Sequence, residues 1–257
     1  MSTKISAFIL AFNSESQIGV ALESLQWVDE IVVIDSHSTD RTVAIAEEHG
    51  AKVVQEDFIG FGRLRNAGIE HTKHDWIFSL DTDERCTSEA RDEIQKIINS
   101  NAAADAYHTP RHNYFMGRFI KYGGWYPNYR QPQLFRRGKL TFPEDDLVHE
   151  GFLLDGRLDE MQCAIEQEPF ETLSDVLYKA NRYSSLSAEK LARDRGQSSA
   201  LRSLAHGFGM FFKMYILRLG ILDGWPGFII AWSNLEGTFY KYAKLAELNR
   251  KGRKQGE

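Results

Sequence analysis

The segment Trp76-Ile77-Phe78-Ser79-Leu80-Asp81-Thr82-Asp83 places two carboxylates one residue apart, directly after a mostly apolar run. Such a short apolar run is typical of a buried strand in a parallel sheet. Carboxylate oxygens are the ligands that Mg²⁺ and Mn²⁺ prefer, and one or two of them often bind the ion together with substrate phosphates. We therefore expect Asp81 and Asp83 to hold a divalent cation, with Glu84 extending the acidic cluster. Loop capping by the aspartates, and a helix-dipole role for Glu84, are the alternatives.

Two further apolar runs also end in a polar side chain. Residues 5–12 precede Asn13, and the β-branched run 31–34 precedes Asp35. Segments with helical spacing separate these runs, and this alternation is typical of a parallel sheet with helices on both faces. In such sheets, ligands bind beyond the carboxyl ends of the strands. We therefore expect Asn13, Asp35 and Asp81 to meet at one edge of the sheet.

Capping residues predict where two of the helices begin. Ser38-Thr39-Asp40 would cap a helix that ends near Gly50, and Ser88 would cap another. Asp35 would then be available to accept a hydrogen bond from a pyrimidine N3–H or a ribose hydroxyl. A simple turn or cap at Asp35 is the alternative.

Basic and amide side chains are candidates for phosphate contacts. Arg63, Arg65 and Asn66 follow a glycine-containing loop at an expected helix start, where side chains and backbone N–H groups can meet phosphates together. A solvated helix face is the alternative. One of three later arginines is expected to neutralise a leaving diphosphate, unless they line a solvated hairpin edge: Arg130, Arg136 and Arg137.

The pair His149-Glu150 is the candidate for proton transfer. A carboxylate or a histidine can deprotonate a sugar hydroxyl that attacks an anomeric carbon. Glu150 would be that base, and His149 a third metal ligand or a phosphate contact. A surface loop with scattered charge is the alternative.

The chain is expected to divide into a catalytic domain at 1–171 and a helical region at 172–257. Residues 105–165 are interpreted as mixed strands and long loops, and helices are expected at about 175–195, 199–219 and 225–249. The last helix carries an apolar stripe and a basic flank. It therefore suits an interfacial membrane segment, or packing on the main domain or on another copy.

Charge is divided between the two parts of the chain. Residues 1–172 carry 17 basic and 29 acidic side chains, and residues 173–257 carry 14 and 7. This asymmetry indicates an acidic catalytic part and a basic docking part, and argues against a nucleic-acid partner. Two cysteines far apart and no apolar run near the ~18 residues of a spanning helix favour a cytoplasmic location.

Two sets of motifs carry a resemblance to a known family. The first set is Ile9-Leu10-Ala11-Phe12-Asn13-Ser14-Glu15, Val33-Ile34-Asp35-Ser36-His37-Ser38-Thr39-Asp40-Arg41-Thr42, Arg65-Asn66-Ala67-Gly68 and Leu80-Asp81-Thr82-Asp83-Glu84. The second set is Pro132-Gln133-Leu134-Phe135-Arg136-Arg137, Val148-His149-Glu150 and Gly220-Ile221-Leu222-Asp223-Gly224. The first set resembles the inverting family-2 glycosyltransferases, and the second narrows the resemblance to a branch that adds β-glucose to an inner-core heptose of bacterial lipopolysaccharide.

The resemblance implies a GT-A fold, which is a Rossmann-like α/β fold, with a UDP-sugar donor and Mg²⁺ or Mn²⁺. Asn13, Glu15 and Asp35 would contact the nucleoside, and Asp81 and Asp83 would serve the ribose and the metal. The acceptor-side acid of the wider family has no clear counterpart here, and Glu150 is taken as its substitute.

These observations together predict an inverting hexosyltransferase. It would move glucose or another hexose from a UDP-sugar to a lipid-linked saccharide at the cytoplasmic face of the inner membrane, with the C-terminal helices docking there or forming a homo-oligomer. A catalytically inactive sugar-nucleotide or glycan-binding module is the main alternative. A phosphatase that uses the two aspartates is disfavoured, because Arg85 stands where such enzymes carry Thr or Val.

Overall fold

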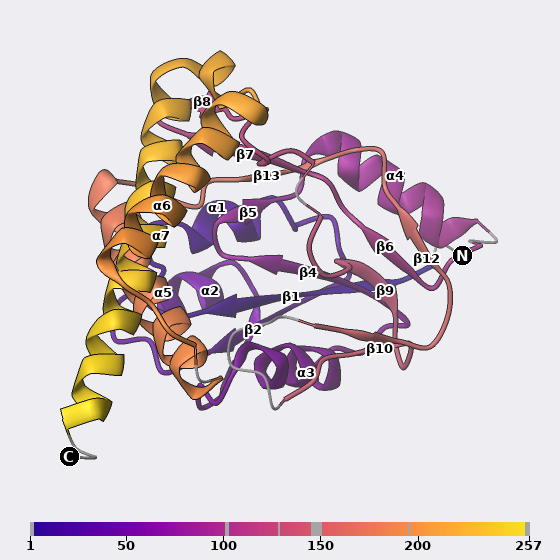
Figure 1. Ribbon diagram of the computed structural model, residues 1–257. Coiled ribbons are helices and arrows are strands. Elements are labelled where there is room, and N and C mark those ends of the chain that lie inside the picture. The colour runs from indigo at the N-terminus through magenta and orange to yellow at the C-terminus, as the bar shows by residue number, and fades with distance from the viewer. Residues whose placement is uncertain (1–2, 101–102, 128, 145–150, 195, 255–257) are drawn as a thin grey trace. The chain divides into compact units, whose positions relative to one another are not determined.

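The structure is a computed structural model that describes residues 3–100, 103–127, 129–144, 151–194 and 196–254, with side chains to residue 251. The chain forms two compact units (Figure 1). The first comprises residues 1–112 and 128–167, and the second comprises 113–127 and 168–257. The predicted boundary at 171/172 stays a prediction, and residues 113–127 belong with the helical unit.

A seven-stranded sheet forms the centre of the first unit, in the order β12-β6-β9-β4-β1-β2-β3. Its parallel part consists of β1 (Ile5–Ala11), β2 (Glu30–Asp35), β3 (Lys52–Gln55) and β4 (Trp76–Asp81). Beyond β4 lie β9 (Leu134–Arg136), which is antiparallel to both neighbours, then β6 (Ala106–His108) and β12 (Leu158–Glu160). The predicted α/β fold class is confirmed.

Alternate residues of the strands enter two separate hydrophobic cores, since successive side chains of a strand point to opposite faces. On β1, Ile5, Ala7 and Ile9 belong to one core, and Phe8 and Leu10 to the other. Helices α1 (Ile18–Glu23), α2 (Thr42–Glu48) and α4 (Ser88–Asn99) cover the first core, and α3 (Phe61–His71) covers the second. Each fully buried aliphatic or aromatic side chain contributes about 1.5–3 kcal/mol.

Helix α3 approaches the sheet closely because it carries Gly68. A Cβ atom at this position would lie only 2.6 Å from the ring of Phe8 on β1. This contact brings the preceding turn of α3, which contains Arg65, down onto the sheet beside β4. A glycine therefore helps to position a site residue.

Two predicted helix caps are wrong by one or more residues. Helix α2 is capped by Arg41 without a side-chain hydrogen bond, because Asp40 binds Thr42 and Ser38 binds Asp35. Helix α4 is capped by Thr87, whose hydroxyl accepts from the backbone N–H of Ala90. A run of two or three capping-type residues predicts a helix start, but the local turn decides which residue takes the cap.

Short strands complete the first unit and connect it to the second. β5 (Glu84–Arg85) pairs with β13 (Ile165–Gln167), and β10 (Leu140–Thr141) pairs with β11 (Leu153–Leu154). β7 (Arg111–Phe115) carries the chain into the second unit, where its end pairs with β8 (Arg118–Phe119). The mixed strands predicted for 105–165 are present.

The second unit is mainly helical. It contains α5 (Leu173–Arg193), α6 (Ala200–Phe212), a π-helical turn (Lys213–Leu217), a 3₁₀ turn (Gly220–Asp223) and α7 (Gly224–Lys254). Thr172 and Asp175 form a reciprocal capping box at the start of α5. The helix predicted at 199–219 is confirmed: α6 is capped by Ser199 and continues through the π-helical turn to Leu217. The backbone then bends at Leu219, which adopts a left-handed conformation (φ 58°).

Candidate functional site

The carboxyl ends of three neighbouring strands carry the predicted acidic and amide residues. β1 lies between β2 and β4, and in register Ala11 is opposite Asp35 while Leu10 is opposite Asp81. Asn13 follows two residues after the end of β1. The fold therefore brings Asn13, Asp35 and Asp81 to one edge of the sheet, as expected from a parallel arrangement.

Hydrogen bonds connect the loops that follow β1, β2 and β4 at this edge of the sheet. The hydroxyl of Thr82 donates to that of Ser14 at 3.2 Å, which joins the loops after β4 and β1. The Asn13 side-chain oxygen accepts from the backbone N–H of Thr39 at 2.8 Å, and Glu15 accepts from that of Arg41 at 2.9 Å. The loops after β1, β2 and β4 thus hold one another.

Asp35 is fully buried and organises the loop that follows it. Its carboxylate accepts from the backbone N–H of Ser38 at 2.8 Å and from the Ser38 hydroxyl. The turn-forming alternative for Asp35 is therefore realised, and its contact with a nucleoside stays a prediction. Further along the loop, burial opposes ionisation of Asp40, but hydrogen bonds from the hydroxyl and N–H of Thr42 and the N–H of Glu15 hold its pKa below the ordinary value.

Asp81 is oriented by a buried arginine. The Arg65 guanidinium, in a residue only 1% exposed, donates to Asp81 Oδ1 at 3.2 Å and to the Ser79 hydroxyl at 3.3 Å, and lies 5.7 Å from the Phe142 ring centre. The Asp81 side chain is 27% exposed, so it faces the surface beyond the strand. Arg65 therefore fixes the direction of this carboxylate; its predicted contact with a phosphate stays a prediction.

Asp83 is held by a residue that the sequence did not single out. The side-chain amide of Gln167, on β13, donates to both Asp83 oxygens at 3.2 and 3.3 Å. Gln167 is 2% exposed, and its side-chain oxygen is buried with no hydrogen-bond partner. The two residues are 84 positions apart, so no local pattern could have linked them.

Glu84 has a structural role that differs from both sequence interpretations. It is 1% exposed and forms an ion pair with Arg111 at 2.6 Å. It also accepts from the Gln133 amide at 2.8 Å and from the backbone N–H of Asp81 at 3.0 Å. Glu84 therefore fixes the turn that carries both aspartates, and it neither extends the acidic surface nor acts on a helix dipole.

The structure does not bring Arg136 to the candidate site. Its partner in register is Trp76, the first residue of β4, whereas Asp81 is the last. The guanidinium lies 4.4 Å from the Trp76 ring centre, and 3.8 Å from the Asp105 carboxylate. The prediction that Arg136 contacts the diphosphate is therefore wrong, because β9 runs antiparallel to β4 and delivers it to the opposite edge. Arg137 binds the Ile69 carbonyl at 2.7 Å.

Asn66 anchors the segment before the predicted general base. Its side chain accepts from the Phe142 N–H at 3.0 Å and donates to the Phe142 carbonyl at 2.9 Å and to Glu144 at 3.1 Å. His149 and Glu150 lie outside the described residues. Both the oxygen and the nitrogen of the Asn66 side-chain amide are used in this structural role. The predicted contact of Asn66 with a phosphate stays a prediction.

The donor set at the strand end fits a hard divalent cation. Asp81 and Asp83 supply carboxylate oxygens, the ligand type that Mg²⁺ and Mn²⁺ prefer. Within the described ranges, no group of three His, Cys, Asp or Glu side chains is arranged to hold a metal. The predicted third ligand, His149, lies outside the described residues.

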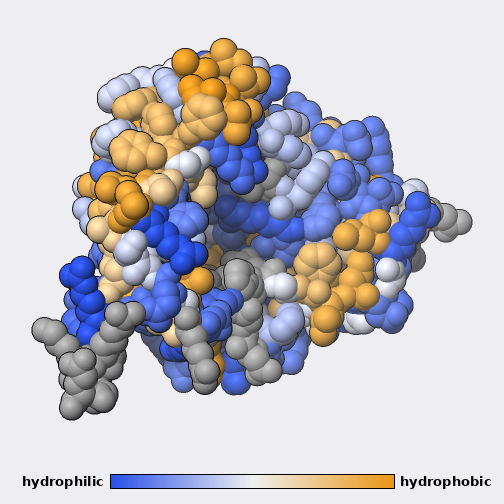
Figure 2. Space-filling view, in the orientation of Figure 1, coloured by the Kyte–Doolittle hydropathy of each residue, from blue (hydrophilic) through white to orange (hydrophobic). Residues whose placement is uncertain are grey.

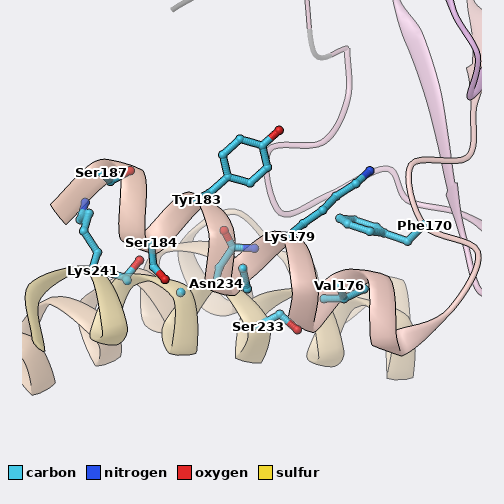
Figure 3. A pocket seen from close by; sticks show the side chains of 12 residues that line it. Phe170, Val176, Lys179, Tyr183, Ser184, Ser187, Ser233, Asn234 and Lys241 are labelled. Atoms are coloured by element: carbon cyan, nitrogen blue, oxygen red, sulfur yellow. The ribbon is translucent and has the colours of Figure 1, made fainter. Parts of the chain in front are cut away.

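A separate cavity of about 310 Å³ lies within the helical unit between α5 and α7 (Figure 3). Lys179, Ser184, Asn234 and Lys241 are among the residues that line it. Lys179 donates to the Pro169 carbonyl at 2.7 Å. No site residue in the described part of the chain is among those that line this cavity, and all of its lining residues belong to the second unit.

Comparison with known proteins identifies the family. The model of glycosyl transferase family 2 matches residues 6–155, which is more than half of the chain. The lipopolysaccharide core biosynthesis glycosyltransferase LpsC of Rhizobium meliloti is 27% identical over 252 residues, covering 94% of this chain and 91% of LpsC. An uncharacterized glycosyltransferase of Rickettsia felis is also 27% identical, over 95% of this chain and 90% of that protein.

Among solved structures, S. aureus TarS matches 65% of this chain with a TM-score of 0.46 and 19% identity. Glucosyl-3-phosphoglycerate synthase from Mycobacterium tuberculosis, in complex with Mn²⁺, UDP and phosphoglyceric acid, matches 42% with a TM-score of 0.37 and 23% identity. The fold is assigned from the family match and from the sheet with its strand-end loops. This chain belongs to glycosyltransferase family 2, and its α/β unit has the GT-A fold.

Proposed function

We propose that this protein is an inverting hexosyltransferase that moves glucose from UDP-glucose to a lipid-linked acceptor of the lipopolysaccharide inner core, such as a heptose. The observation that carries the proposal is the gathering of Asn13, Asp35 and Asp81 at the ends of three adjacent strands. The likeness to LpsC over nearly the whole chain supports the acceptor class. The reaction would take place in the cytoplasm at the inner membrane.

Different loops at the strand ends would bind different parts of the UDP-sugar donor. Asn13, Glu15 and Asp35 lie in the loops after β1 and β2 and would receive the nucleoside. Asp81 and Asp83 would hold Mg²⁺ or Mn²⁺ beside the diphosphate. The bound ion would stabilise the negative charge that develops on departing UDP. Arg65 and Gln167 keep the two carboxylates in place.

Inversion follows from a single displacement at the anomeric carbon. The acceptor hydroxyl oxygen forms a bond to that carbon while the bond to the diphosphate oxygen breaks, and UDP leaves with the electron pair. A base must take the hydroxyl proton, and Glu150, next to His149, is the proposed residue. Asn66 contributes by anchoring Phe142 and Glu144, shortly before this pair in the chain.

Sugar transfer to a heptose-terminated acceptor tests the proposal. We expect the wild-type protein with Mn²⁺ and UDP-glucose to form a β-linked product, identified by its anomeric NMR coupling. Asp83→Ala should lower the rate on the order of 100-fold or more, whereas Asp92→Ala, in an exposed ion pair on α4, should leave it unchanged.

Two outcomes would reject the proposal. Transfer by Asp83→Ala at the wild-type rate, with chelator present, would remove the metal site from the mechanism. Calorimetric binding of UDP-glucose with no product from any saccharide acceptor would instead identify a sugar-nucleotide binding module.

A further inference from the structure

The second unit carries an unusually apolar exposed surface where α6 passes into α7. Figure 2 shows hydrophobic side chains gathered there, at the top of the view. Eight large apolar residues between positions 208 and 225 are each 43–66% exposed, and we call them the apolar tip. They are Phe208, Phe212, Ile216, Leu217, Leu219, Ile221, Leu222 and Trp225.

The tip is unsuited to simple spanning of a membrane. Considered singly, no helix in the described part of the chain has the length and apolar character needed to cross one. One pair, Ala200–Leu217 and Gly220–Lys251, meets those criteria together but is bent by 72° at the break between its halves. A bent apolar segment of this kind suits partial insertion from one side.

The backbone of the bend is satisfied internally, which a lipid environment requires. The N–H of Arg218 donates to the Lys213 carbonyl, that of Leu219 to Ile216, and that of Leu222 to Leu219.

Residues of the segment 113–127, in the same unit, donate hydrogen bonds to two backbone carbonyls of the bend. The Arg218 carbonyl accepts from the N–H of Gly123, and the Leu222 carbonyl accepts from the guanidinium of Arg118. The irregular turns can therefore approach an apolar phase with these backbone groups paired.

Glycines allow the segments that carry the tip to pack closely. A Cβ atom on Gly227 would lie 2.1 Å from the Gly220 carbonyl oxygen, and one on Gly207 would lie 3.2 Å from that of Leu235. At these positions α7 approaches the 3₁₀ turn and α6 at backbone distance, and beside them Phe211 packs against Phe228 and Trp232.

Along the chain from Ala200 to Leu235, every exposed charge is positive. Between Ala200 and Leu235 the only acidic residue is Asp223, and it is 2% exposed. Its carboxylate accepts the backbone N–H groups of Lys121 at 3.2 Å and Tyr122 at 2.9 Å. Lys213 and Arg218 remain exposed among the apolar side chains. Their long side chains can reach headgroup phosphates while the apolar residues enter the acyl region.

We propose that the apolar tip inserts into the interfacial layer of an anionic phospholipid bilayer, with Lys213 and Arg218 at the phosphate level. A second copy of the chain suits this surface less well. Two tips placed together would juxtapose their basic side chains, and the tip offers no exposed acid to neutralise them. Anionic lipids supply that charge. This inference rests on the proposed function, because insertion of the tip would bring the enzyme to its lipid-linked acceptor.

Vesicle co-sedimentation of the full-length protein, without nucleotide sugar, tests the inference. We expect binding to vesicles of phosphatidylethanolamine and phosphatidylglycerol that is stronger than to phosphatidylcholine vesicles and that weakens with salt. Leu217→Gln/Leu222→Gln should weaken it roughly tenfold or more. The matched control is Leu173→Gln/Leu177→Gln on α5, where exposure is 49% and 57% against 66% and 52% at the tip.

The charge contribution has its own variant pair. Lys213→Gln should reduce the preference for anionic over zwitterionic vesicles, and Lys190→Gln on α5 should not. Circular dichroism must show the wild-type helix content for each variant, so that lost binding reports the surface and not unfolding.

Three results would overturn the inference. The tip variant and its α5 control could bind vesicles equally, or the wild-type protein could fail to bind anionic vesicles. Alternatively, sedimentation velocity could show a wild-type dimer that the tip variant converts to monomer, which would assign the tip to a second copy. Transfer to a detergent-solubilised acceptor, measured in parallel, distinguishes failure of the membrane surface from failure of the transferase assignment.

Discussion

The buried Gln167 amide donates to both carboxylate oxygens of Asp83, at 3.2 and 3.3 Å. Gln167 pairs in register with Glu84, the residue after Asp83. A strand late in the first unit therefore holds the second aspartate of the predicted metal site. Removing a side chain that orients a metal ligand typically lowers metal affinity by roughly 10- to 100-fold.

Replacement of Gln167 tests this relationship. Gln167→Leu keeps the side-chain size and removes the amide, so Asp83 loses its orientation. We expect the Mn²⁺ concentration for half-maximal transfer to rise on the order of 10-fold, with little change in stability because the Gln167 oxygen has no partner to lose. Gln162→Leu, at an exposed position in the same segment, is the control. An unchanged metal requirement would leave Gln167 with a packing role only.

Arg65 should matter to both stability and activity. Arg65→Met removes the hydrogen bonds to Asp81 and Ser79, and charged hydrogen bonds of this kind contribute about 1.5–3 kcal/mol each when a partner is left unsatisfied. We expect the unfolding free energy in urea to fall by about 3 kcal/mol or more, and transfer to fall more steeply than stability explains. Glu70→Gln, at an exposed position of the same helix, should change neither. Equal effects of the two variants would contradict the orienting role.

Within the acidic turn 81–84, replacement of Glu84 should lower the stability of the fold most. Glu84→Gln keeps the shape of the side chain but leaves Arg111 as a buried charge without its carboxylate. Breaking a buried pair in this way typically costs about 3–5 kcal/mol. Urea unfolding measures the loss, with Glu89→Gln on exposed α4 as the control. A loss below that of the control would show that Arg111 is neutralised by other groups.

His108 should make the first unit sensitive to mild acid. Burial lowers its pKa below the ordinary 6.5, and its ring packs against Tyr129 and Phe152. The unfolded chain therefore binds a proton at a higher pH than the folded protein, so the free energy of unfolding should fall as pH drops below about 6.5. His108→Phe should flatten the pH dependence of urea stability below about pH 6.5. Parallel pH curves for the wild type and His108→Phe would contradict this assignment.

Several elements were predictable because their information is local. The apolar runs of β1, β2 and β4 each end within one residue of the predicted limit. Parallel order then places Asn13, Asp35 and Asp81 at one edge. The helix starts at Thr42 and Ser88 were less accurate, since neighbouring residues of similar capping ability compete and the surrounding hydrogen bonds select among them.

The contacts of the site were not predictable from local patterns. Arg136 and Arg65 are both arginines near apolar runs, yet one stacks on Trp76 at the start of β4 and the other binds Asp81 at its end. The difference is the antiparallel direction of β9, which no feature of its three residues reveals. The Glu84–Arg111 pair likewise joins residues 27 positions apart.

The sequence alone determined the alternation of strands and helices, the polar residues that end the strands, and the resemblance to the family, because these depend on composition and spacing along the chain. Tertiary structure decided which groups touch: Gln167 on Asp83, Arg65 on Asp81, and Glu84 buried against Arg111. These contacts form when folding brings segments that are distant in the sequence together. An unpaired buried charge is costly in the low dielectric of the interior, so each one is paired with a residue that no local sequence pattern indicates.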